Sequence, residues 1–248
     1  EIVGQDNIID RLLNVAKRIK LGFKEENKPY SLLFVGASGV GKTRLATIYG
    51  NYMVSEANVI RMDMSEYAEN HTVSKIIGSP PGYVGYMDNK NILEEIKNKP
   101  YSILIVDEIE KAHPSIINIF FQILDEGKIK DSKGNIIRFD NVTIIFTSNI
   151  GFSKGMVGFK NDNDNIIFEL KEKLTVEFVN RIDDVFIFNK LNNDNIKKIV
   201  IKQLEKLKNK FLKKGINKDI NNDVINHIMD LSNFNDFGAR KIDKIIKN

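Results

Sequence analysis

The sequence contains no cysteine. This absence excludes a disulfide framework, a thiol nucleophile and a thiolate metal site, and it fits a reducing compartment. The sequence also has no apolar run long enough to cross a bilayer, and its first residues lack the basic and apolar pattern of a targeting segment, so we expect no membrane association. We expect both ends of the chain to lie within a longer protein.

Arginine is scarce as well. The net charge is +4, with 37 basic and 33 acidic residues, but the lysines are spread along the chain among carboxylates, which favours a solvated surface and predicts no nucleic-acid partner. Lysine can replace arginine where only a positive charge is needed, whereas it cannot supply a planar set of donors. The few arginines that remain are therefore candidates for specific roles, and we single out Arg181 and Arg240.

The strongest motif is a glycine-rich loop between an apolar run, 31–35, and a helical segment that begins near Arg44. Glycines let the backbone curl with its N–H groups inward, and the helix that follows adds the positive end of its dipole. Lys42 is placed to reach β- and γ-phosphates, and the Thr43 hydroxyl is placed to hold Mg²⁺. The loop comprises Gly36, Ala37, Ser38, Gly39, Val40, Gly41, Lys42 and Thr43.

Polar side chains end two other apolar runs. Asp107 and Glu108 follow residues 102–106, and Asn149 follows shortly after 142–147. Ligands bind at the carboxyl ends of strands in open α/β sheets, so we expect these three side chains at one edge. Neighbouring residues of a strand point to opposite faces of the sheet. Asp107 can therefore reach a metal while Glu108 activates the water that attacks the γ-phosphate. Asn149 is placed to hydrogen-bond that water or the γ-phosphate, and the alternative is that all three are simple strand-ending residues.

Strands and helices alternate up to about residue 188, which predicts an α/β fold with a mostly parallel sheet flanked by helices. From Leu191 onward only helical patterns occur. We therefore place a nucleotide-binding α/β domain at 1–189 and a small helical lid, which we expect to lack a last element, at 190–248. The expected strands are 31–35, 58–63, 102–108, 142–147 and 185–188, and the expected helices lie within 1–20, 44–49, 64–77, 112–124, 170–181, 195–212, 224–231 and 239–246.

Three loops carry further signals. Residues 78–86 are rich in glycine and proline yet hold two tyrosines and a valine, which either grip a polypeptide of any sequence or fold over the domain's own core. Residues 128–139 alternate around a Lys-Gly pair and predict a hairpin. Residues 156–159 form an apolar island that is either tucked into the domain or offered to a partner.

Together these motifs resemble the second ATPase module of the Clp unfoldases, which belong to the AAA+ superfamily. The resemblance covers essentially the whole chain, and it implies a ring of six identical subunits that hydrolyses ATP and pulls unfolded or tagged proteins through its centre. It rests on Val3-Gly4-Gln5, residues 36–43, Gly82-Tyr83-Val84-Gly85, Asp107-Glu108 with Lys111-Ala112-His113-Pro114, Thr147-Ser148-Asn149, Phe178-Val179-Asn180-Arg181-Ile182-Asp183 and Gly238-Ala239-Arg240.

The resemblance implies a catalytic role for residues at the sheet edge. Lys42 and Thr43 correspond to residues that bind phosphate and Mg²⁺. Asp107 corresponds to the Walker B metal acid, and Glu108 to the catalytic base. Asn149 resembles the residue called sensor 1.

The resemblance also implies roles away from that edge. Arg181 matches the arginine finger, which reaches the γ-phosphate held by the neighbouring subunit. Arg240 matches sensor 2 in the lid, and Ile2 and Val3 correspond to residues that line the adenine pocket. The hairpin within 128–139 is similar to a second pore loop. The substrate-gripping pore loop corresponds to Gly82, Tyr83, Val84 and Gly85.

One short segment distinguishes subtypes within this family. Val157, Gly158 and Phe159 resemble the tripeptide by which ClpC-type unfoldases dock on the ClpP peptidase, so we expect delivery to a ClpP-type peptidase. The alternative is a ClpB-type disaggregase that acts without a peptidase. The chain departs from the family pattern at residues 87–90, 175–176 and 241.

Two other functions fit the sequence less well. A nucleic-acid motor needs a basic channel where this chain has Tyr83 and Val84. A nucleotide switch with little turnover needs neither Glu108 nor Arg181, and both are present. Composition and family resemblance together lead us to expect a plastid-like organelle or a bacterial-type cytoplasm.

Overall fold

A computed structural model of the chain describes residues 2–78, 91–152, 163–215, 221–231, 239, 242, 245 and 246. The helices are α1 (Asp6–Lys20), α2 (Lys42–Met53), α3 (Ser74–Ile77), α4 (Ile92–Asn98), α5 (Pro114–Glu126), α6 (Asn163–Leu174), α7 (Val176–Asn180), α8 (Asn193–Leu212) and α9 (Asn222–Leu231). The strands are β1 (Tyr30–Val35), β2 (Val59–Asp63), β3 (Ile103–Asp107), β4 (Lys128–Lys130), β5 (Ile136–Arg138), β6 (Thr143–Ser148) and β7 (Asp184–Ile187). Short 3₁₀ turns are η1 (Glu56–Asn58), η2 (Met64–Tyr67), η3 (Asn70–Val73) and η4 (Ile109–Lys111).

Five strands form one parallel sheet in the order β2-β3-β6-β1-β7, which confirms the predicted α/β fold. β1, β3 and β6 are buried along their whole length. Both faces of these strands are covered, which is why their sequences are continuous apolar runs. The edge strand β2 alternates instead, with Ile60 and Met62 buried and Arg61 and Asp63 exposed.

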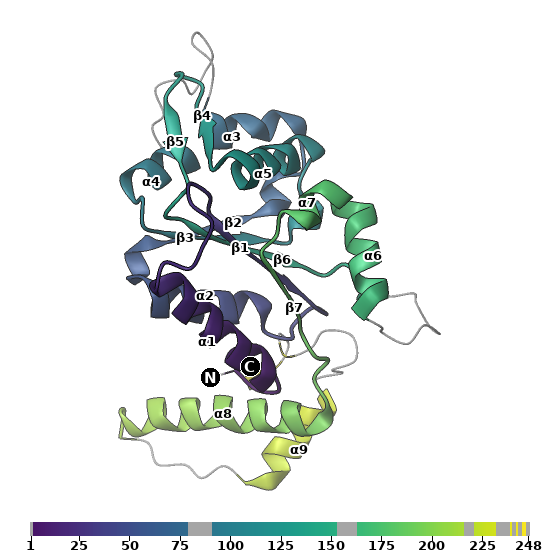
Figure 1. Cartoon of the computed structure of the whole chain (residues 1–248). Helices are drawn as coiled ribbons and strands as arrows, with labels where there is room; N and C mark the ends of the chain where they lie inside the picture. The colour runs from purple at the N-terminus through teal and green to yellow at the C-terminus, as the bar shows by residue number, and fades with distance from the viewer. Residues whose placement is uncertain are drawn as a thin grey trace.

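Helices cover both faces of the sheet (Figure 1). α1 and α2 pack on one face, and their buried side chains form a single core with Phe34 and Ile105. α5, α6 and α7 pack on the other face around Val106 and Phe146. Successive residues of β3 therefore face different layers, and Asp107, two positions after Ile105, lies on the α2 side.

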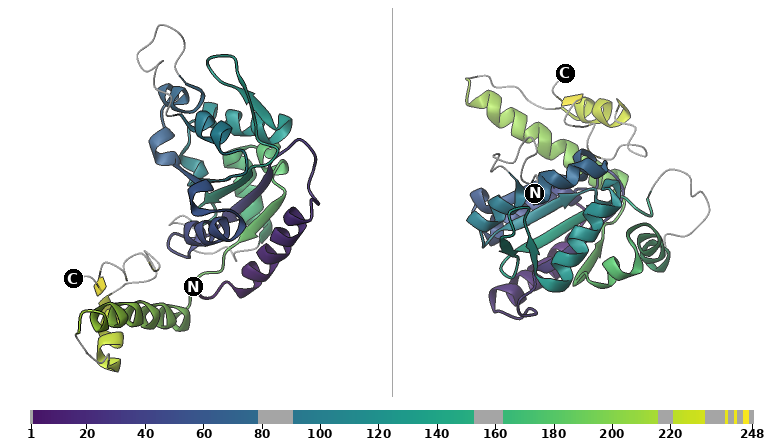
Figure 2. Two further views of the ribbon diagram at one scale, coloured as in Figure 1. Left: turned by 90° about the vertical axis from the view of Figure 1, so that its left-hand side faces the viewer. Right: turned by 90° about the horizontal axis from the view of Figure 1, so that it is seen from above.

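The helices after residue 190 form a separate unit. Figures 1 and 2 show α8 and α9 beyond the layer of α1 and α2, at the end of the molecule opposite the β4–β5 hairpin. None of the helices in the described parts of the chain has the length and apolarity that a membrane span requires. The core of this unit contains Ile196, Val200, Leu204, Ile225, Ile228 and Ile242.

The hairpin predicted within 128–139 is confirmed. β4 and β5 pair in antiparallel fashion. The Asp131 carboxylate closes the turn by accepting hydrogen bonds from the backbone N–H groups of Lys133 and Asn135, at 2.9 and 2.8 Å.

The single helix predicted over 170–181 is wrong. α6 ends at Leu174, and Thr175 has a φ of 72°, which few β-branched residues adopt. The Thr175 hydroxyl accepts a hydrogen bond from the N–H of Phe178 and so starts α7 as a new helix. α6 begins at Asn163, inside a segment expected to be a loop, and α4 was not predicted. Most of the helix predicted at 239–246 lies outside the described residues.

Candidate functional site

The glycine-rich loop connects β1 to α2 at the carboxyl edge of the sheet. Gly41, immediately before α2, has a φ of 105°, and Gly39 has a φ of 80°. Glycine adopts such angles without steric cost. Within the described residues no side chain caps the start of α2, so its first N–H groups remain available to a ligand. Together with the helix dipole, they make this turn a site for an anion.

Lys42 is buried, and its ammonium is held at the loop. The Nζ atom donates hydrogen bonds to the carbonyl oxygens of Gly36 (2.6 Å) and Ala37 (2.8 Å) and to Asn149 Oδ1 (2.8 Å). These acceptors offset the cost of burying a charged group. The positive charge is thereby fixed beside the N-terminus of α2, where two or more phosphate oxygens could replace the carbonyl groups as acceptors.

Asp107 is buried and joins the loop to the end of β3. Its Oδ1 accepts a hydrogen bond from the Thr43 hydroxyl at 2.7 Å and another from the Thr147 hydroxyl. Its Oδ2 lies 2.7 Å from Nη2 of Arg61. A hydroxyl and a carboxylate side by side are oxygen donors that suit Mg²⁺. No group of three or more His, Cys, Asp or Glu side chains in the described parts of the chain is placed to hold a metal. A metal here would therefore also need oxygens from the ligand, as Mg²⁺ bound to phosphates has.

Glu108 follows Asp107 in an unusual backbone conformation. Its φ and ψ are both 55°, in the left-handed region, which costs about 1–2 kcal/mol for a residue with a side chain. Its N–H donates to the Thr147 hydroxyl at 3.0 Å, which fixes the turn. The carboxylate accepts a hydrogen bond from Asn149 Nδ2 (3.3 Å) and is paired with the Lys111 ammonium. The hydrogen bond to Glu108 raises the pKa of Lys111 above its ordinary value.

Asn149 connects the cation at the loop to the carboxylate at the strand end. Its side chain accepts from Lys42 and donates to Glu108. Its backbone N–H donates to Glu110 Oε1 at 2.9 Å, which holds the residue in place. Asn149 thus lines the same cavity as Asp107 and Glu108, as the strand ends predicted, and it bonds Glu108 directly.

Two cavities meet at the loop. One, of about 290 Å³, is lined by Lys42, Thr43, Asp107, Glu108 and Asn149, among others. The second, of about 250 Å³, is lined by the apolar residues Ile2, Val3, Val40 and Leu191 and by α8, which contributes Ile199 and several polar side chains.

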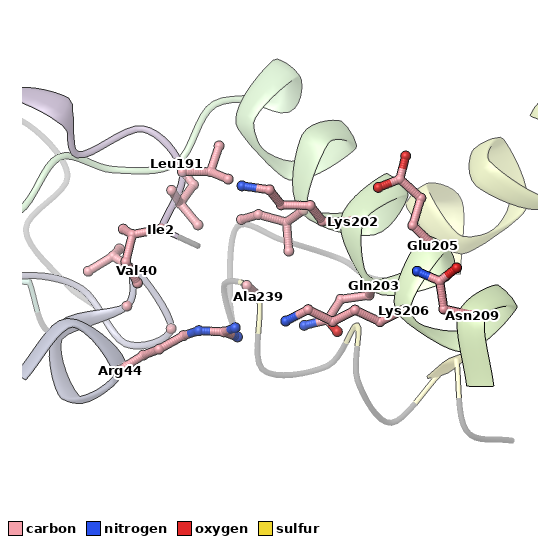
Figure 3. A pocket seen from close by; sticks show the side chains of 14 residues that line it. Ile2, Val40, Arg44, Leu191, Lys202, Gln203, Glu205, Lys206, Asn209 and Ala239 are labelled. Atoms are coloured by element: carbon pink, nitrogen blue, oxygen red, sulfur yellow. The ribbon is translucent and has the colours of Figure 1, made fainter. Parts of the chain in front are cut away.

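The two cavities share Gly39, Gly41, Arg44 and Ala239, so they adjoin at the loop. Figure 3 shows Ile2 and Val40 on one side of the second cavity and the α8 side chains on the other, with Arg44 extending between them. The backbone N–H of Ala239 donates to the carbonyl of Gly39 at 3.3 Å and so joins the lid to the loop. An anionic group in the first cavity can therefore belong to a molecule whose apolar part fills the second.

Of the remaining predicted site residues, only Arg181 is described, and it lies away from this cleft. Arg181 follows α7, and its guanidinium lies 2.8 Å from Asp125 Oδ1 and 5.9 Å from the centre of the Phe121 ring, both on α5. It lines neither of the two cavities. The pore-loop residues 82–85, the tripeptide 157–159 and Arg240 lie outside the described residues.

Several residues at the cleft had no role predicted from the sequence. Arg61 and Thr147 bind Asp107, Lys111 binds Glu108, and Glu110 binds the backbone of Asn149. Thr147 and Lys111 stood inside motifs without an assigned role. Arg61 had one available signal, because it is among the few arginines in a lysine-rich chain.

A phosphate-binding loop, a buried acid at the end of a central strand and an adjacent carboxylate define a P-loop nucleoside triphosphatase. The family described as AAA domain (Cdc48 subfamily) matches residues 27–185, and the chain belongs to this family of ATPases. The family described as C-terminal, D2-small domain, of ClpB protein matches residues 191–248. The chain is accordingly a second ATPase module of the ClpB/ClpC-like type.

Curated relatives are chaperone proteins named ClpB. The protein from Clostridium tetani is 40% identical over 256 residues, which cover 100% of this chain and 30% of that protein. The protein from Mycoplasma genitalium is 40% identical over 247 residues, with 99% and 34% covered. The mitochondrial ClpB4 of Arabidopsis thaliana is 36% identical over 259 residues, with 99% and 27% covered. The chain therefore spans about a third or less of the length of these relatives.

A solved structure of Hsp104 with ATPγS and FITC casein, in a closed state, has the same fold. It superposes with a TM-score of 0.85 at 32% sequence identity and covers 100% of this chain and 44% of the Hsp104 chain. This similarity confirms the AAA+ fold with a C-terminal helical domain.

Proposed function

We propose that this chain binds ATP with Mg²⁺ and hydrolyses it within a six-membered ring that threads polypeptide through its centre, as a ClpB-type disaggregase acting without a peptidase. The observation that carries the proposal is the convergence of Lys42, the Thr43–Asp107 pair and the Glu108–Asn149 pair on one cavity. The cavity thus holds a cation for phosphate, a pair of oxygen donors for a metal and a carboxylate that can activate water.

The roles follow from the contacts of each residue. Lys42 and the first N–H groups of α2 bind the phosphates, while Thr43 and Asp107 are the protein groups that hold Mg²⁺. Bound Mg²⁺ neutralises phosphate charge in the transition state. Glu108 takes the proton of the attacking water, and Asn149 orients that water through the amide that already bonds the Glu108 carboxylate.

The nucleoside would occupy the second cavity. Ile2 and Val3 contribute to its apolar lining, as an adenine pocket requires. Arg240 follows Ala239, which contacts the loop, and is proposed to sense the nucleotide from the lid. A boundary between a nucleotide-binding domain (1–189) and a lid (190–248) is supported by the separate core of the lid and by the family matches on either side of residue 190.

Arg181 is proposed to act on the neighbouring subunit. Its guanidinium is bound to Asp125 and lies outside the cavities of its own chain, although it belongs to a motif that resembles an arginine finger. In a ring with head-to-tail contacts, a surface arginine of one subunit can complete the site of the next. Hydrolysis would then require assembly.

The substrate is proposed to be unfolded or aggregated protein. FITC casein is present in the Hsp104 structure, and in the present chain Tyr83 within residues 82–85 is proposed to grip the polypeptide. The curated relatives reported above are named ClpB, so they favour the disaggregase over delivery to a ClpP-type peptidase through residues 157–159. The relatives come from bacteria and from a plant mitochondrion, which supports a bacterial-type cytoplasm or an organelle without specific support for a plastid.

The test is recovery of an aggregated reporter enzyme by the full-length protein with ATP and no peptidase. We expect recovery by the unmodified protein. Tyr83→Ala should keep its ATP turnover and lose recovery, because apolar grip and phosphate chemistry use different residues. Tyr101→Ala is a matched control, since this tyrosine is 65% exposed and lies before β3. If the reporter is not recovered and is instead released as peptides when a ClpP-type peptidase is added, the disaggregase is contradicted. Full recovery by Tyr83→Ala would contradict the grip.

A further inference from the structure

Arg61 is an arginine at the phosphate cavity that the proposed mechanism does not use. It lies on the edge strand β2, on the face that also carries Asp63. Its Nη2 is 2.7 Å from Asp107 Oδ2, and it lines the cavity beside Lys42 and Thr43. The Arg61 side chain is 54% exposed, whereas that of Asp107 is 7% exposed, so the arginine has solvent around it while the carboxylate is enclosed.

The strand register explains why a cation is needed at this position. Asp63 and Asp107 are direct partners across β2 and β3, so two carboxylates stand side by side. The Asp63 carboxylate accepts hydrogen bonds from the hydroxyl and the backbone N–H of Ser65. These two bonds are the main reason that the pKa of Asp63 is lowered. Arg61 reaches diagonally from β2 and places a full positive charge against Asp107.

A metal and this guanidinium would compete for the same carboxylate. Asp107 Oδ1 already accepts two hydroxyls, and Oδ2 accepts Arg61. A cation beside a carboxylate weakens the binding of a second cation to it. A guanidinium carries five N–H donors on a long side chain and binds phosphate oxygens as well as it binds carboxylates.

We propose that Arg61 is a positioning residue that neutralises Asp107 in the nucleotide-free protein and moves to a phosphate oxygen of the nucleotide when Mg²⁺ takes its place. This inference rests on the nucleotide site proposed above. Arg61 differs from Lys42, which is buried and donates to three acceptors, none of them Asp107, in the hydrogen bonds given above. Movement of Arg61 links release of the Asp107 carboxylate to binding of the metal–nucleotide complex.

The test is equilibrium binding of a fluorescent ATP analogue to the full-length protein, first in EDTA and then titrated with Mg²⁺. Arg61→Gln removes the competing charge, so we expect the Mg²⁺ concentration for half-saturation of the nucleotide complex to fall by about fivefold. Affinity for the nucleotide in EDTA should stay within about twofold, because Arg61 stays on Asp107 when no metal is present. Arg61→Lys keeps the charge without the planar donors and should leave the Mg²⁺ half-saturation near that of the unmodified protein.

Arg18→Gln is a matched control. Arg18 is also a half-exposed arginine, with 53% of its side chain exposed, and it pairs with Asp184 at 2.9 Å, yet it does not line the cavity. It should change neither measurement. A thermal melt of each variant shows whether it is folded before binding is compared.

Arg61→Gln with an unchanged or a higher Mg²⁺ half-saturation would overturn the inference, because a purely supporting ion pair weakens metal binding when it is lost. Failure of the unmodified protein to bind the nucleotide at all would instead refute the proposed function. The two failures are therefore distinguishable.

Discussion

Replacement of Glu108 by glutamine should separate nucleotide binding from hydrolysis. The carboxylate of Glu108 bonds Asn149 and Lys111, not the loop residues Lys42 and Thr43. Glutamine has the same shape and can still accept from Asn149, but its amide cannot take a proton from water. We therefore expect nucleotide affinity to stay within about twofold and turnover to fall by about 10²–10⁴.

The effect on folding should be small. The lost ion pair with Lys111 is partly exposed, since 50% of the lysine side chain is accessible, so its contribution to stability is about 1 kcal/mol or less. For a domain of this size the midpoint of thermal unfolding should fall by less than about 4 °C. The drop in turnover cannot then be attributed to unfolding.

The assay is steady-state ATP turnover of the assembled full-length protein, with binding of a fluorescent ATP analogue measured in parallel. Glu172→Gln, on the exposed side of α6, is the control for loss of a surface carboxylate. Turnover of Glu108→Gln within tenfold of the unmodified protein would refute the role of general base. A loss of nucleotide affinity equal to the loss of turnover would place Glu108 in binding instead.

Two further predictions concern the core and the subunit contact. Phe146→Ala removes a fully buried ring whose centre lies 5.4 and 5.3 Å from the rings of Phe120 and Phe178, both edge-on. It should lower the free energy of unfolding, measured by urea denaturation, by about 3–5 kcal/mol. A loss below about 1 kcal/mol would mean that the site is not close-packed. Arg181→Ala should abolish turnover of the assembled ring and leave nucleotide affinity unchanged, because the arginine lies outside the cleft of its own chain; normal turnover would remove it from the chemistry.

The sequence was informative where one local signal decides the structure. The central strands could be predicted because burial on both faces makes their sequences continuously apolar. The loop at 36–43 could be predicted because its glycines, its lysine and its threonine serve one ligand. Asp107, Glu108 and Asn149 could be placed together because parallel strands end at the same edge of a sheet.

The sequence was less informative where contacts depend on how strands align or on the cost of one backbone angle. The Arg61–Asp107 pair depends on the register of β2 against β3, which the sequence does not reveal. The break between α6 and α7 depends on the positive φ of Thr175, whereas the side-chain pattern continues through it as though in one helix. The Lys111–Glu108 pair depends on the left-handed conformation of Glu108, which the residue types of this segment do not predict.

The most direct measurement of the shared active site is turnover by mixed rings. In such a ring, Arg181→Ala subunits keep Glu108 and Glu108→Gln subunits keep Arg181, so an interface between the two has one complete site when they stand in the correct order. Random mixing in equal amounts gives a complete site at about a quarter of the interfaces. We predict that two inactive variants regain ATP turnover when mixed and reassembled. A mixture no more active than its separate components would contradict hydrolysis completed by the neighbouring subunit.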